Sequence, residues 1–96
     1  MPRSDLKTTR ELAWIGDAVL SLHGRRWILA NLGAMDGAML TRFTSNRFLA
    51  ALGNPTEVEA TIGALYESDG YEAACAFIDS EIIPLFRRQE ANRRAH

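Results

Sequence analysis

The sequence predicts an all-helical protein with a single domain. Apolar residues recur at helical spacing along most of the chain, no alternating strand pattern is present, and helix start and stop signals flank the apolar segments. The 96 residues are enough for one core, and we expect no second domain among them. We therefore expect one domain over residues 1–96, with residues 1–7 and 89–96 as frayed polar ends.

The first predicted helix is long and apolar on nearly every side. Thr8 and Glu11 have the spacing of a capping box at its start, and Gly33 follows Leu32 at its end. A helix that is apolar nearly all round is central to its fold. We expect either other helices of the chain or a second subunit to cover it.

Caps and breaks predict the remaining helices. In chain order, Asp36 precedes a helix that runs to Phe43, and Thr44 or Ser45 precedes a short helix that stops at Gly53. Asn54 and Pro55 precede a helix that ends near Ser68–Gly70. A last helical stretch begins at Tyr71, and Pro84 should kink or restart it.

Composition excludes several classes of protein. No run of about twenty apolar residues is free of charge, so we expect no membrane span. The N-terminus has no apolar core of a secretory signal, and the single cysteine, Cys75, indicates a reducing compartment, so we expect a cytoplasmic protein. The net charge is −1, but seven bases against four acids precede Asn54, so a basic face in the first half is possible.

One acid stands alone in the first helix. Between Leu12 and Gly24 the only formally charged side chain is Asp17, and a lone carboxylate in apolar surroundings is costly unless it is paired, hydrogen-bonded or bound to a metal. Glu59 is the best candidate partner. Gly16 beside Asp17 and Gly63 one turn after Glu59 suggest that the two helices approach closely there. Two such carboxylates suit Mg²⁺ or Mn²⁺, whereas a solvated surface acid is the alternative for each.

Four segments of the chain, taken together and in this order, form a recognisable pattern. They are LAWIGDAVL (12–20), TRFTSNRFLA (41–50), VEATIGALY (58–66) and DGYEAA (69–74). This set resembles the catalytic domain of ribonuclease III. The resemblance implies a shortened, dimeric, all-helical bundle that hydrolyses double-stranded RNA with Mg²⁺ bound by acidic side chains.

The chain also departs from the family pattern. Two of the usual four acids are replaced by Ala13 and Thr56, as in the Mini-ribonuclease III branch, which lacks a double-stranded-RNA-binding domain. Only Asp17 and Glu59 carry over as catalytic and metal-binding residues, and Asp36 could assist through water. Residues 51–57 replace a longer helix and loop of the family.

The resemblance also implies two surfaces. The expected phosphate contacts to double-stranded or structured RNA are Arg25, Arg26, Arg42 and Arg47. The expected homodimer interface lies on the first helix, at Leu12, Trp14, Ile15, Gly16 and Val19.

Three functions remain compatible with these features. The first is a metal-dependent endoribonuclease that acts on double-stranded or structured RNA as a homodimer. The second is a catalytically weak or inactive relative that binds RNA or a ribonucleoprotein, which Ala13 and Thr56 favour. The third is a helical dimerisation module without an RNA role, which the slightly acidic net charge favours.

Overall fold

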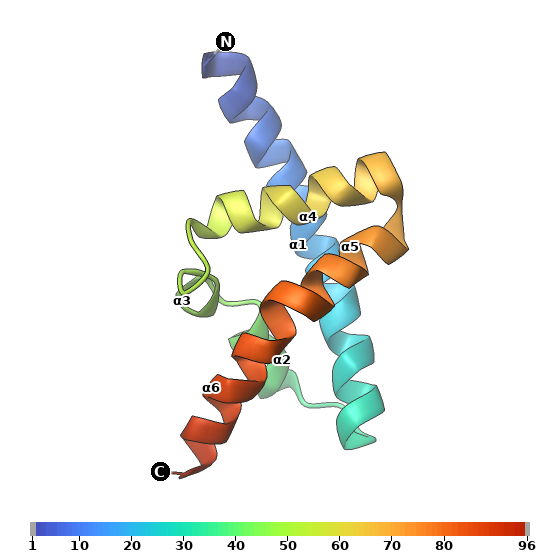
Figure 1. Ribbon diagram of the computed structural model, residues 1–96, viewed down its shortest axis with the longest axis vertical. Helices are drawn as coiled ribbons and strands as arrows, with labels where there is room; N and C mark the ends of the chain where they lie inside the picture. Colours follow the sequence, from blue (N-terminus) through green and yellow to red (C-terminus); the bar gives the residue numbers. More distant parts are fainter. Residues whose placement is uncertain (1, 96) are drawn as a thin grey trace.

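The fold is built around one long helix, α1 (Pro2–Leu32), against which three of the later helices pack (Figure 1). The computed structural model describes residues 2–95; Met1 and His96, which belong to the ends expected to fray, lie outside the described residues. No strand occurs between residues 2 and 95, so the all-helical prediction is confirmed. The later elements are α2 (Gly37–Phe43), α3 (Asn46–Leu49), α4 (Pro55–Asp69), α5 (Tyr71–Phe77), the π-helical turn η1 (Ile78–Ile82) and α6 (Ile83–Ala95).

Three of the predicted caps are present as hydrogen bonds. The Asp36 carboxylate accepts from the Met39 amide at 2.9 Å, and the Ser45 hydroxyl accepts from the Phe48 amide at 3.1 Å. At the start of α4 the Asn54 side chain accepts from a backbone amide at 3.1 Å. Each side chain satisfies a donor that the first turn of its helix leaves unpaired.

Both ends of the chain differ from the prediction. α1 begins at Pro2 rather than at Thr8, since a proline suits the first position of a helix and Thr8 continues it. α6 runs to Ala95 instead of fraying from residue 89. The sequence of α6 is mostly polar, but the helix makes tertiary contacts, since Phe86 is buried and Glu90 pairs with Arg42 of α2.

Pro84 changes the helix without breaking it. The turn before it is π-helical, and the Ile83 amide donates to the carbonyl of Ile78, five residues back. A proline ring in a regular α-helix clashes with the carbonyl four residues earlier, and a wider turn relieves that clash. α5, η1 and α6 therefore follow one another as a continuous, bent helical path (Figure 1).

The core joins α1 to the second half of the chain. Phe43, Phe48 and Phe86 form edge-to-face and stacked pairs with ring centroids 5.0 to 6.1 Å apart. Beyond this aromatic cluster the fully buried side chains are aliphatic, among them Leu20 and Ile62. Among the described residues, every helix is too short or too polar to span a lipid bilayer.

The tightest contact in the fold lies between α1 and α4, which make the most extensive helix pair. A Cβ atom on Gly16 would overlap the carbonyl oxygen of Glu59, and one on Gly63 would overlap the carbonyl oxygen of Leu12. The two backbones thus touch where each helix has a glycine. This is the close approach that the sequence predicts.

We expect Gly63→Ala to lower the free energy of unfolding by about 1–3 kcal/mol or more, because the new methyl group meets backbone that cannot rotate away. Urea unfolding measures the change. Gly37→Ala is the matched control, since a Cβ there meets no atom within 4 Å. Equal stability of the two variants would contradict the close contact.

Candidate functional site

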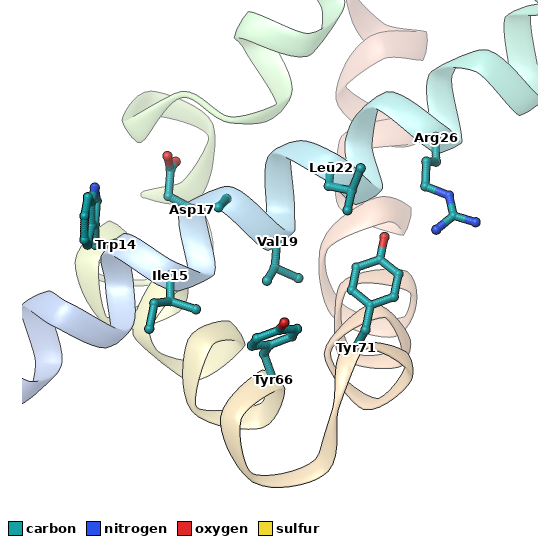
Figure 2. A pocket seen from close by; sticks show the side chains of 9 residues that line it. Trp14, Ile15, Asp17, Val19, Leu22, Arg26, Tyr66 and Tyr71 are labelled. Atoms are coloured by element: carbon teal, nitrogen blue, oxygen red, sulfur yellow. The ribbon is translucent and has the colours of Figure 1, made fainter.

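The glycine contact sets two acidic side chains next to each other. Asp17 follows Gly16 on α1, and Glu59 is the α4 residue whose carbonyl group covers Gly16. Asp17 is exposed, whereas Glu59 is partly buried. Figure 2 shows Asp17 projecting from α1 on the side away from Ile15 and Val19. The structure therefore brings together the two acids that the sequence pairs.

The surroundings of Glu59 favour its protonated form. Burial raises the pKa of this carboxyl first, and a hydrogen bond to Asp17 and the negative charge of Asp17 raise it further, from 4.5 to about 8. At neutral pH the protonated form of Glu59 is therefore favoured, and it avoids the repulsion between two ionised carboxylates that lie side by side.

A divalent cation could take the place of that proton. Carboxylate oxygens are hard ligands that suit Mg²⁺ or Mn²⁺, and the exposure of Asp17 leaves room for water to complete the coordination shell. The described residues contain no group of three or more His, Cys, Asp or Glu side chains placed to hold a metal. At the two positions that depart from the family pattern, Ala13 is buried and Thr56 is exposed. The acid pair could thus offer a cation two protein ligands.

Asp36 does not join this pair. Its carboxylate caps α2, and it lines a surface hollow with Arg25 and Leu29 of α1. Arg25 is eight residues beyond Asp17 on the same helix, which corresponds to about 12 Å along the axis. The expectation that Asp36 assists at the acid pair is therefore corrected, because its capping hydrogen bond holds Asp36 near the C-terminal end of α1.

The four predicted phosphate contacts fall in different places. Arg25 reaches the Ser21 hydroxyl at 3.4 Å, and the guanidinium of Arg26 lies 5.8 Å from the ring centroid of Tyr71. Arg42 and Arg47 line one groove beside α6. The sequence could not show this division, because adjacent residues of a helix point about 100° apart.

The five residues predicted at a homodimer interface are also divided. Gly16 and Val19 are buried within the single chain, and Gly16 is closed by α4, so its contact surface is already used. Leu12 and Ile15 are partly buried. Trp14 is 82% exposed and is therefore the member of the set most open to a partner.

An apolar groove lies beside Trp14. It has a volume of about 760 Å³. Ile15 and Val19 point toward Tyr66, and the Tyr71 hydroxyl points toward Arg26 (Figure 2). Neither tyrosine was expected at a site, although the two flank the break between α4 and α5. Their place on either side of Gly70, opposite an apolar helix, is the signal that could have found them.

The structure also adds residues to the arginine groove. Gln89, Glu90 and Arg93 of α6 line it together with Arg42 and Arg47. These residues were missed because the end of the chain was expected to fray. The spacing of Phe86, Glu90 and Arg93, four and then three residues, is a helical face that could have revealed them.

We expect the free energy of unfolding to fall as the pH rises from about 4.5 to about 8, because the folded protein holds a proton on Glu59 that the unfolded chain releases at lower pH. The stabilisation is complete below pH 4.5 and is lost through pH 8. Glu59→Gln should remove this pH-dependent component, so that at pH 9 the variant should have a higher free energy of unfolding than the wild type. Urea unfolding at several pH values measures it, and Glu67→Gln, an exposed acid on the same helix, should keep the wild-type slope.

No protein-family model matches this chain, and neither does any curated protein or solved structure in the comparisons. What the chain does is therefore inferred from its own residues. The feature with the clearest chemistry is the carboxyl pair at the crossing of α1 and α4.

Proposed function

We propose that this protein is a divalent-cation-dependent endoribonuclease that acts on double-stranded or structured RNA as a homodimer. The observation that carries the proposal is the Asp17–Glu59 pair: the two acids lie next to each other at the contact of Gly16 and Gly63, where burial and Asp17 raise the pKa of Glu59. The choice of RNA rests on the resemblance of four sequence segments, which include both acids, to ribonuclease III.

Two neighbouring acids do not stabilise the fold in the way that an ion pair does, because like charges at close range repel each other. The apolar surface of the helix does not require acids at this position either. A shared cation would relieve the repulsion between the two carboxylates and add attraction to both of them. Cation binding therefore requires Glu59 to lose the proton that its raised pKa favours.

The two residues have different tasks in this proposal. Asp17, being exposed, reaches a cation from the solvent side. Glu59, being partly buried on α4, holds it from the protein side, and its carbonyl group fixes the position of α4 over Gly16. When bound, Mg²⁺ supplies activation of water at neutral pH and stabilises the charge that develops on the phosphate.

The homodimer part of the proposal rests on exposed apolar surface. Trp14 is 82% exposed, Leu22 48% and Tyr66 39%, and they surround the groove drawn in Figure 2. Large apolar side chains gathered in this way mark a surface that binds a partner. A second copy presents the same face of α1, so a two-fold axis through this surface buries Trp14 from both chains.

A second candidate function has one specific observation in its favour. Among the described residues only two acids meet at the site, with Ala13 and Thr56 where the resembled family has two more. A protein of this kind would bind structured RNA without cutting it. A cleavage assay separates the two functions.

We expect Asp17→Asn to lower RNA cleavage in Mg²⁺ by about 100-fold or more, equivalent to about 2.7 kcal/mol of lost transition-state stabilisation. The fold should survive, because Asp17 is exposed and asparagine has nearly the same size and shape. Cleavage of long double-stranded RNA, with and without EDTA, is the measurement. Asp69→Asn changes an exposed acid at the far end of α4 and should cut like the wild type.

Two results would count against catalysis at this pair. Undiminished cutting by Asp17→Asn would overturn the assignment of the site. Binding of RNA by the wild type without cutting, at every Mg²⁺ and Mn²⁺ concentration, would favour the second candidate function.

We expect Trp14→Arg to convert the dimer into a monomer, because a charged side chain on each copy would face its symmetry mate across an apolar surface. Sedimentation equilibrium gives the mass directly. Met35→Arg is the matched control, since Met35 is 89% exposed but lies in the loop after α1, away from the groove. A wild-type mass equal to that of one chain would contradict the homodimer.

A further inference from the structure

A second groove runs between α6 and the short helices α2 and α3. It has a volume of about 550 Å³ and is the more polar of the two grooves. Arg42 and Arg47 come from the first half of the chain, and Gln89, Glu90 and Arg93 from α6. Figure 1 shows α6 leading away from the crossing of α1 and α4, so this groove is separate from the acid pair.

The positive charges of this groove outnumber the negative ones. Arg42 donates two hydrogen bonds to the Glu90 carboxylate, Nε to Oε2 and Nη2 to Oε1, each of 2.9 Å. The positive charges of Arg93 and Arg94 also act on Glu90, and the negative charge of Asp36 acts on Arg42. Among the residues that line the groove, there are thus three guanidinium groups, of Arg42, Arg47 and Arg93, and one carboxylate, of Glu90.

The Arg42–Glu90 pair is a fixed part of the groove wall. Its two parallel hydrogen bonds lock both side chains, and the Arg42 guanidinium keeps the pKa of Glu90 below its usual value. Ser45 is occupied as well, because its hydroxyl donates to the Arg42 carbonyl at 2.8 Å and accepts from the Phe48 amide. Arg47, Gln89 and Arg93 are exposed, so their donors face the solvent.

We propose that this basic groove, lined by Arg47, Gln89 and Arg93, binds the phosphodiester backbone of RNA at a distance from the acid pair. The choice of RNA as the polyanion rests on the proposed function. The groove would hold the substrate while another part of the same strand or duplex reaches Asp17 and Glu59.

A polymer suits this groove better than a small anion does. An exposed arginine contributes little to binding a single ion, because water and salt screen its charge. A nucleic acid instead gains from several such contacts at once, since each neutralised phosphate releases a condensed counterion. Guanidinium groups also match the geometry of phosphate oxygens.

A substitution at Glu90 tests the proposal through an expected gain of RNA affinity instead of a loss. Its carboxylate repels phosphate, while its oxygens hold Arg42 in place. Glu90→Gln keeps the shape and one acceptor for Arg42 but removes the negative charge. RNA binding should therefore become tighter, even though the fold loses part of an ion pair.

The experiment measures RNA binding in EDTA, so that it does not depend on cleavage. The probe is a double-stranded RNA of about 20 base pairs, titrated at several salt concentrations by fluorescence anisotropy. We expect Arg47→Glu and Arg93→Glu each to weaken binding by about tenfold and to lower the slope of log affinity against log salt by about one. Glu90→Gln should strengthen binding several-fold. Arg88→Glu, the same charge change on an exposed residue of α6 outside the groove, should have a much smaller effect.

The outcomes separate this inference from the proposed function. Equal affinities of the Arg93→Glu and Arg88→Glu variants, both folded by circular dichroism, would overturn the groove even if the wild type cuts RNA. Wild-type binding that depends on Arg47 and Arg93 but is never followed by cleavage would support the groove and contradict catalysis. No RNA binding by the wild type at low salt, or equal binding of an acidic peptide by the groove, would overturn the inference.

Discussion

The contact of α1 with α4 through Gly16 and Gly63 is the constraint on which the rest of the structure depends. Because neither glycine has a side chain, the carbonyl groups of Glu59 and Leu12 lie directly against the opposite helix. That proximity brings Asp17 and Glu59 together, and burial and the neighbouring Asp17 raise the pKa of Glu59. Beyond this crossing, α5 lies against α1, whereas α6 leads away from it (Figure 1). One backbone contact thus sets the two acids of the pair beside each other.

The helices could be predicted where their signals are local. Asp36, Ser45 and Asn54 each cap a helix within three residues of themselves, so their roles can be read without knowing the fold. α6 could not be predicted in this way, because what holds its polar sequence is remote. Its ion pair with Arg42 spans 48 positions of the sequence. Local polarity suggested a frayed end where a tertiary contact maintains a helix.

Only the acid pair at the centre of the site could be predicted from the sequence. A charged residue in an apolar helix, together with a glycine near each acid, is enough to single out Asp17 and Glu59 in the sequence. The surrounding surfaces depend on which way each helix is rotated, and periodicity does not fix that rotation when a helix is apolar on many sides. For this reason the arginines predicted as one surface lie at three separate places. Arg25 lines the hollow beside Asp36, Arg26 lines the apolar groove, and Arg42 and Arg47 line the groove beside α6. The two tyrosines of the apolar groove, Tyr66 and Tyr71, were not predicted for the same reason.

The π-helical turn before Pro84 explains how the second half of the chain keeps one buried face. Ala74, Ile78, Ile82 and Phe86 are all buried and recur at intervals of four residues. In a regular α-helix a residue turns by about 100°, so twelve residues would rotate this row by about 120° away from the core. The extra residue of η1 removes about 100° of that drift. Glu90, the next position in the row, consequently faces Arg42, so the shape of the basic groove is set by a single inserted residue more than two turns away.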